Sequence, residues 1–176
     1  MGWLIVKYKS QIPNLFTLLN LSLGVLAIIA IFYEEYSSSA MLIIIAGMMD
    51  RMDGKLARKF DVVSDFGKEL DSLCDLISFG IAPAILMWNL NLMETGIVGI
   101  AITLIFALCG TVRLARYNVM EFEGVYMGIP ITLCGGLVAL MALYSTKYVT
   151  SLSFMLGAML FLSYAMVSKR IKLKKR

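Results

Sequence analysis

Two short stretches decide the fold of this chain: residues 50–58 read DRMDGKLAR, and residues 67–75 read GKELDSLCD. They contain four aspartates, and each lies inside or beside a long apolar run. An ionised carboxylate at the middle of a membrane costs about 2.5–3.5 kcal/mol, so four of them need a compensating partner. Bound divalent cations can provide it. The four residues are Asp50, Asp53, Asp71 and Asp75.

The composition indicates an integral membrane protein. Of the 176 residues, 60% are hydrophobic and 16% are charged, and the mean hydropathy is +0.83. A soluble domain of this length carries more charge. Six stretches contain no charged residue, and most reach the ~17–25 residues that cross a bilayer as a helix. They cover residues 10–33, 36–49, 76–93, 95–112, 124–146 and 148–168.

We therefore predict an all-α integral membrane protein with six transmembrane helices in a single domain, residues 1–176. Pro13 suits the first turn of the first helix, and residues 1–10 are expected to form a short interfacial segment. Pro83 is expected to kink the third helix or to redirect its outer half. The remaining helices are predicted at about 39–60, 65–88, 94–118, 128–147 and 150–169.

Basic residues predict the orientation. If the N-terminus is cytoplasmic, fifteen of the 16 Lys and Arg residues lie on the cytoplasmic side, including the tail at 169–176, and only Lys147 lies outside. The positive-inside rule then places both termini in the cytoplasm and opens the polar cavity to the cytoplasmic interface of the cell membrane. Orientation and attraction to anionic headgroups explain the net charge of +4. No nucleic-acid partner is predicted.

The absence of histidine limits the chemistry. It excludes Ser-His-Asp and Cys-His catalysis and histidine-based zinc sites. The three cysteines lie far apart in apolar runs and are expected to be free thiols. Carboxylates, tyrosine, lysine and metal-bound groups remain for acid–base work.

The spacing of the two acidic stretches places their small and charged residues on one face of each helix. Two antiparallel helices in this register bring four carboxylates around one or two hard cations, and oxygen ligands suit Mg²⁺ or Mn²⁺. A solvated interfacial face is one alternative, and a cation transporter or channel is another. The residues are Asp50, Asp53, Gly54, Ala57 and Arg58 on the second helix, and Gly67, Asp71 and Asp75 on the third.

The pattern D-x2-D-G-x2-A-R-x8-G-x3-D-x3-D resembles the signature of the CDP-alcohol phosphotransferase family, and every fixed position is present. The hydropathy profile is also similar to the six-helix fold of that family. The resemblance implies transfer from a CDP-linked donor to an alcohol, with release of CMP. It implies that Asp50, Asp53 and Asp71 ligate metal, that Asp75 contributes to a second ion, and that Asp75 is the general base.

The same resemblance implies the donor contacts. Arg58 would bind the diphosphate, and three small residues would face the cytidine nucleotide. The segment IPNLFT, residues 12–17, resembles the part of the family's first helix near the nucleotide. A homodimer is also implied. The expected CDP-lipid-binding residues are Asn14, Thr17, Gly54, Ala57, Arg58 and Gly67.

Residues 113–118, RLARYN, resemble a stretch of the phosphatidylserine synthase branch of this family. Arg113 and Arg116 are spaced i, i+3 and suit an anionic acceptor, although they can also be a positive-inside anchor. We predict L-serine as the acceptor and CDP-diacylglycerol or CDP-archaeol as the donor. Inositol phosphate or glycerol phosphate is the alternative acceptor. The expected acceptor-binding residues are Ser78, Arg113, Arg116 and Asn118.

Overall fold

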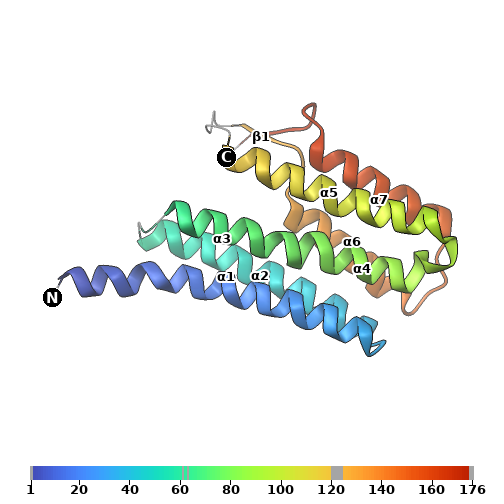
Figure 1. Ribbon diagram of the computed structural model, residues 1–176, viewed down its shortest axis with the longest axis horizontal. Coiled ribbons are helices and arrows are strands. Elements are labelled where there is room, and N and C mark those ends of the chain that lie inside the picture. The colour runs from blue at the N-terminus through green and yellow to red at the C-terminus, as the bar shows by residue number, and fades with distance from the viewer. Residues whose placement is uncertain (1, 61, 63, 120–124, 175–176) are drawn as a thin grey trace.

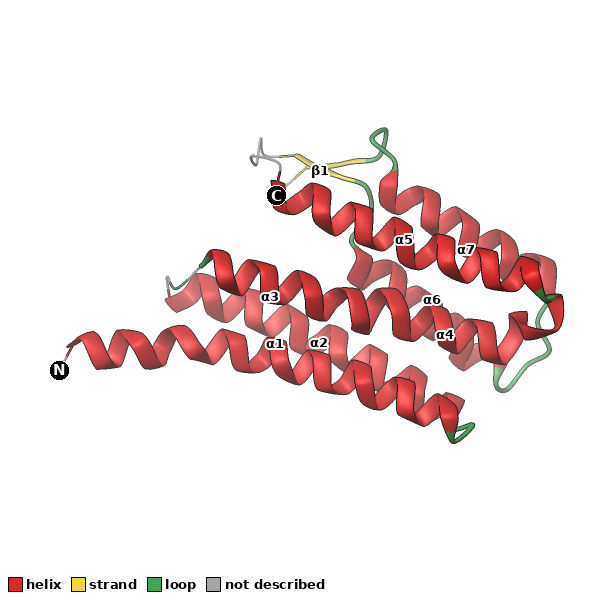
Figure 2. Cartoon of the chain, viewed as in Figure 1, coloured by secondary structure: helices red, strands yellow, loops and turns green. Residues whose placement is uncertain are grey.

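The computed structural model describes the backbone of residues 2–60, 62, 64–119 and 125–174 and, within these ranges, all side chains except those of residues 2–11, 53, 57, 58, 60, 125, 126 and 172–174. The described residues form six helical rods that lie along the long axis of the molecule, and successive rods run in opposite directions (Figures 1 and 2). These are α1 (Gly2–Phe32), α2 (Tyr36–Phe60), the continuous run from α3 to η3 (Asp65–Thr95), α5 (Ile97–Val119), α6 (Ile131–Ser145) and α7 (Leu152–Val167).

The third rod changes helix type along its length. Its segments are α3 (Asp65–Asp75), η1 (Leu76–Ile81), α4 (Ala82–Met87), η2 (Trp88–Leu92) and η3 (Met93–Thr95), and η1 and η2 are π-helical. Pro83 stands in the first turn of α4, directly after η1. A proline removes one backbone donor and crowds the preceding turn, which the wider π-helix accommodates. The irregularity expected at Pro83 therefore takes this form, and the rod continues to Thr95 instead of ending at Trp88.

Helix α1 begins at Gly2, so the prediction that it starts at Pro13 is wrong. Inside a helix, Pro13 costs the one hydrogen bond that its missing N–H would have donated. Residues 3–12 contain no other proline and no glycine, so nothing else in them breaks the helix. The first turns of α1 project beyond the rest of the bundle (Figure 1). The predicted interfacial segment is thus continuous with the first helix.

Local signals explain where two of the helices begin. Ser64 has extended backbone angles, φ −134° and ψ 153°, and its hydroxyl accepts a hydrogen bond from Gly67 N at 3.1 Å. This N-cap starts α3 at Asp65, as predicted. Helix α6 starts at Ile131, later than predicted, because Gly128 has a φ of +78° and Pro130 is extended at ψ 140°.

A two-stranded antiparallel ribbon joins the end of the chain to the connection before α6. Strand β1 (Val125–Met127) pairs with β2 (Lys172–Lys174), and Gly128 N donates to Ile171 O at 2.9 Å. The all-α fold class is confirmed, and this short ribbon is an addition to it that the sequence did not predict. Helix α7 ends at Val167, and the residues after it form a loop that leads into β2, beside β1 (Figure 2).

The packing leaves an apolar outer surface. Helix α1 packs along α2, α5 along α7, and α2 along α6, around a core that includes the fully buried Phe79 and Phe106. The apolar side chains of Leu104 and Phe161 are 55% and 63% exposed. Three helical segments are long and apolar enough to cross a membrane, Ile12–Phe32, Asp65–Thr95 and Ile97–Val119, and α6 and α7 are shorter apolar helices. These are the properties of a membrane protein.

Neighbouring glycines in α6 give a test of this packing. A Cβ on Gly135 would lie 2.7 Å from Phe79 Cα, whereas one on Gly136 would meet nothing within 4 Å. We expect Gly135→Ala to destabilise the protein by about 1–3 kcal/mol, because η1 and α6 must separate. Gly136→Ala should leave the stability unchanged. Thermal unfolding in detergent measures both, and equal unfolding temperatures would contradict this packing.

Candidate functional site

Three aspartates from two helices meet at one place. Asp50 on α2 and Asp71 and Asp75 on α3 each offer one carboxylate oxygen, and the three oxygens lie within 4.8 Å of one another. The i, i+4 spacing puts Asp71 and Asp75 on the same face of α3. The predicted meeting of the two acidic stretches is confirmed for these residues. The side chain of Asp53 lies outside the described residues.

Helix α1 holds the two acidic helices together. It packs along both α2 and α3, while within the described residues the backbones of α2 and α3 approach each other at no more than isolated points. The two helices that carry the aspartates are therefore held near each other by α1, without close backbone packing between them. Thr132 on α6 also lies within hydrogen-bonding reach of Asp50.

Asn20 is a site residue that the sequence-based analysis missed. Its side chain is fully buried in α1, and its Nδ2 donates to Asp75 Oδ1 at 3.2 Å. Asp75 itself is only 7% exposed. The available signal was an amide in the middle of the uncharged stretch 10–33, where polar groups usually need a partner.

Ser78, which was predicted to contact the acceptor, lies at the crossing of α1 and η1. Its side chain is fully buried, and its hydroxyl donates to the main-chain carbonyl of Asn20 at 3.0 Å. A Cβ on Gly24 would come within 2.8 Å of Ser78 Cα, so the glycine allows α1 and η1 to approach closely. Ser78 therefore fixes the part of α1 that carries Asn20.

The three carboxylates fit a hard divalent cation. Like charges at this separation repel one another, and the repulsion is strong where water is scarce. A divalent cation removes the repulsion, and oxygen ligands are those that hard cations prefer. The partly buried position of Asp50 and Asp71 and the buried position of Asp75 match a site between helices rather than a solvated surface.

The residues predicted to bind the donor divide into two groups. Asn14 and Gly67 come together, because a Cβ on Gly67 would lie 3.2 Å from Asn14 Oδ1. Thr17 is buried one turn further along α1, where its hydroxyl donates to Pro13 O at 3.1 Å. Gly54 is exposed on α2. The side chains of Ala57 and Arg58 lie outside the described residues.

The two arginines of α5 have different surroundings. The guanidinium of Arg113 lies 5.9 Å from the ring centre of Tyr117, and it is near enough to Asp75 for an electrostatic interaction. Its buried Nε has no hydrogen-bond partner among the described residues. Arg116 Nη1 donates to Val167 O at 3.0 Å and so caps the last turn of α7. Of the two, Arg113 is the one with an electrostatic interaction with Asp75.

Asn118 joins α5 to α3. Its Oδ1 accepts from Ser72 Oγ at 3.1 Å, and its Nδ2 donates to Glu69 Oε2 at 3.0 Å. The main-chain carbonyl of Asn118 accepts from Lys68 Nζ at 3.1 Å. These contacts set the end of α5 against the helix that carries Asp71 and Asp75.

Comparison with known proteins identifies similar chains. A family model described as CDP-alcohol phosphatidyltransferase matches residues 10–167. A CDP-diacylglycerol–serine O-phosphatidyltransferase of Bacillus subtilis is 34% identical over 161 residues, which cover 91% of this chain and 88% of the relative.

Two archaeal relatives are longer than this chain. A protein of the same name from Methanocaldococcus jannaschii is 42% identical over 68% of this chain and 54% of its own length. An archaetidylserine synthase of Methanothermobacter thermautotrophicus is 34% identical over 81% of this chain and 61% of its own length. The chain thus spans a little over half the length of these two relatives.

Cation binding tests the carboxylate cluster. With Mn²⁺ as the probe, we expect Asp71→Asn to weaken binding by more than the roughly 10–100-fold that the loss of an outer partner of a metal site costs. Asp65→Asn is the matched control, because Asp65 is exposed in the first turn of the same helix and lies outside the cluster. Electron paramagnetic resonance of free Mn²⁺ measures both affinities. Equal loss in the two variants would rule out this site.

Proposed function

The chain belongs to the CDP-alcohol phosphatidyltransferase family, and from this membership we propose that it transfers the phosphatidyl group of CDP-diacylglycerol, or the corresponding group of CDP-archaeol, to the hydroxyl of L-serine. The products are phosphatidylserine, or its ether-lipid analogue, and CMP. The observation that carries the proposal is the meeting of Asp50, Asp71 and Asp75 within 4.8 Å in a chain whose relatives bear this name.

In the proposed site, Asp50, Asp53 and Asp71 ligate one Mg²⁺ or Mn²⁺ ion, and Asp75 contributes to a second. When bound, divalent cations neutralise the diphosphate and the charge that develops on the departing CMP. The oxygen-only donor set supports this choice of metals.

Asp75 is the proposed general base. The hydrogen bond from Asn20 to Asp75 Oδ1 orients the carboxylate, and we propose that its oxygens serve both the second ion and the hydroxyl of serine. As that hydroxyl forms a bond to the lipid-side phosphorus, its proton passes to Asp75, and the bond from phosphorus to CMP breaks. Burial of Asp75 and Asn20 keeps competing water away from this step.

For the CDP-linked donor, we propose contacts from the first three rods. The neighbouring Asn14 and Gly67 support this assignment, because they put a polar group beside a residue without a side chain. Thr17 lies one turn further along α1. Arg58 is proposed to bind the diphosphate in a bidentate manner. The full set is Asn14, Thr17, Gly54, Ala57, Arg58 and Gly67.

Arg113 is the proposed ligand of the serine carboxylate. Its proximity to Asp75 would bring the acceptor hydroxyl to the base, and its Nε, which has no hydrogen-bond partner in the described part of the chain, leaves donor capacity for a ligand. We propose that Ser78, Arg116 and Asn118 act indirectly, because their described hydrogen bonds hold α1, α7 and α3 around the acceptor space.

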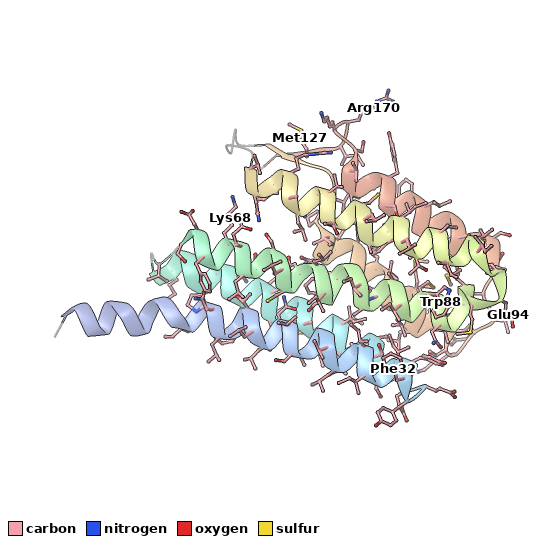
Figure 3. The ribbon with its side chains drawn as sticks, in the orientation of Figure 1. Phe32, Lys68, Trp88, Glu94, Met127 and Arg170 are labelled. Atoms are coloured by element: carbon pink, nitrogen blue, oxygen red, sulfur yellow. The ribbon has the colours of Figure 1, made fainter. Side chains whose placement is uncertain are left out.

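The proposed setting is the cytoplasmic membrane, with six membrane-crossing rods, both termini in the cytoplasm and the site facing it. Figure 3 places Lys68 near the end of the bundle that carries the site and Glu94 at the opposite end. This separation agrees with the positive-inside rule. We further propose a single catalytic domain and a homodimer.

Two alternatives compete with this function. A cation transporter is set aside, because the family to which the chain belongs consists of enzymes. An acceptor such as inositol phosphate or glycerol phosphate would satisfy the same arginines, and the acceptor assay separates it from serine.

We expect purified protein to release CMP from CDP-diacylglycerol only when L-serine and either Mg²⁺ or Mn²⁺ are both present. If serine is the acceptor, parallel reactions with inositol phosphate and glycerol phosphate should give no CMP above background. Labelled donor followed by lipid chromatography identifies the product headgroup. Product formation with a different acceptor, and not with serine, would refute the assignment.

Asp75→Asn tests the base. We expect turnover to fall by about 10²–10⁴-fold or more, while binding of the CDP-linked donor largely survives because its other contacts are intact. Serine-dependent CMP release and donor binding by calorimetry measure the two effects. Undiminished turnover would overturn the role of Asp75 as base.

A further inference from the structure

Main-chain hydrogen bonds attach the end of the chain to the rest of the bundle. Strand β2 pairs with β1 from Val125 opposite Lys174 to Met127 opposite Lys172. The ribbon lies at the end of the bundle where α5 ends (Figure 2). A basic tail that only orients the protein in the membrane needs charge and no strand pairing. The pairing is therefore a feature that membrane orientation does not explain.

Main-chain contacts continue from the ribbon to the start of α6. Gly128 lies directly against the last turn of α7, because its φ is +78° and a Cβ on it would run into Met166 O. The next residue, Ile129, donates its N–H to Ala165 O at 3.1 Å. The carbonyl of Pro130 then accepts hydrogen bonds from the first turn of α6. The ribbon and the end of α7 thus fix the point where α6 begins.

The first turn of α6 reaches the carboxylate cluster. Ile131 is buried, and its Cδ1 would lie 2.6 Å from a Cβ on Gly110 of α5 and 3.4 Å from one on Gly80 of η1. Thr132, the next residue, lies within hydrogen-bonding reach of Asp50. A shift of this turn would therefore move Ile131 out of the gap that the two glycines leave, and it would move Thr132 away from Asp50.

The packing of α6 against α7 gives this turn little support. A groove of about 460 Å³, lined by both helices, separates the middle of α6 from α7. The connection between the two helices, residues 146–151, lies at the opposite end of α6. Near the carboxylate cluster, the described links between the start of α6 and the residues at and after the end of α7 include the contacts of Gly128 and Ile129 and the ribbon.

We infer that β2 is a positioning element of the proposed catalytic site: by pairing with β1 it sets the first turn of α6 and so holds Thr132 beside Asp50. The inference rests on the proposed function for its effect on turnover. Its structural part, that strand pairing sets the start of α6, is measured without turnover.

The register of the ribbon provides two matched substitutions. Hydrogen-bonded pairs alternate along an antiparallel ladder, and Gly128 N donates to Ile171 O at 2.9 Å, so the next such pair is Tyr126 with Leu173. Leu173→Pro therefore removes an N–H that the ladder uses, whereas Lys172→Pro removes one that points away from β1. Lys172→Pro also removes a positive charge, and Leu173→Pro does not. The two variants thus separate strand pairing from charge.

Thiol alkylation reports the position of α6. Cys134 lies in the first turns of α6 and Cys74 lies in α3, and both are buried. In detergent, we expect Leu173→Pro to raise the rate at which N-ethylmaleimide alkylates Cys134 roughly tenfold, because the first turn opens more often. Lys172→Pro should match the wild type, and Cys74 should stay protected in both variants. Mass spectrometry of the labelled peptides measures each rate.

Three outcomes of this measurement would overturn the inference. An unchanged rate for Cys134 in Leu173→Pro would show that the strand does not set α6. The same acceleration in both proline variants would assign the effect to something other than the ladder hydrogen bond. Exposure of Cys74 together with Cys134 would show that the ribbon supports the whole bundle and not the start of α6.

Turnover tests the catalytic part. We expect Leu173→Pro to lower kcat for serine-dependent CMP release roughly tenfold and to change KM for serine little, because Thr132 contacts Asp50. Lys172→Pro should keep the wild-type kcat. An unchanged kcat in Leu173→Pro would refute the role in positioning the site. A wild-type protein that releases no CMP would instead refute the proposed function, and the alkylation rates would still decide the structural part.

A disulfide can replace the lost hydrogen bond. Met127 and Lys172 form a non-hydrogen-bonded pair, in which the Cα atoms are ~4.5 Å apart, within the range that a disulfide spans. Met127→Cys and Lys172→Cys, combined with Leu173→Pro, should give wild-type kcat when the pair is oxidised and the lowered kcat when it is reduced. Failure of the cross-linked protein to recover would contradict positioning by β2.

Discussion

The site is built around three carboxylates whose oxygens lie within 4.8 Å of one another in an apolar bundle. Such a cluster is unfavourable by itself, because the charges repel one another and little water is present to screen them. The surrounding helices fix its geometry, and a bound divalent cation would relieve the repulsion. Asn20 supplies one fixed donor to Asp75.

Close backbone contacts hold η1 against its neighbours α1 and α6. Gly24 lets α1 approach η1 at Ser78, and Gly135 lets α6 approach η1 at Phe79. The third rod is thus clamped between α1 and α6 just beyond Asp75. Because these contacts are made by backbone atoms, side-chain rearrangement does not relax them easily. The cluster therefore lies beside a closely packed part of the bundle.

The other side of the site is assembled by contacts between helix ends. Arg116 caps α7, Asn118 joins α5 to α3, and the β1–β2 ribbon fastens the connection before α6 to the residues after α7. Arg116 and Asn118, which were predicted to contact the acceptor, thus make hydrogen bonds that hold helices in position. Arg113 differs from them in having an electrostatic interaction with Asp75.

The sequence was sufficient to predict the helical rods and the meeting of Asp50, Asp71 and Asp75, because helical periodicity and the cost of buried charge are local constraints. It did not predict Asn20, whose partner is 55 residues away, since pairing at that distance depends on how α1 crosses η1. The ribbon was also missed, because each of its two strands has three residues and is too short to give a pattern in the sequence. The predicted start of α1 was wrong, because a proline that suits a first turn is also tolerated inside a long membrane helix.

The central claim is that this carboxylate cluster holds divalent cations. Crystals grown with saturating Mn²⁺, with diffraction recorded at the manganese absorption edge, test it most directly. The account predicts an anomalous peak between Asp50, Asp71 and Asp75. Well-ordered carboxylates with no anomalous density between them would contradict it.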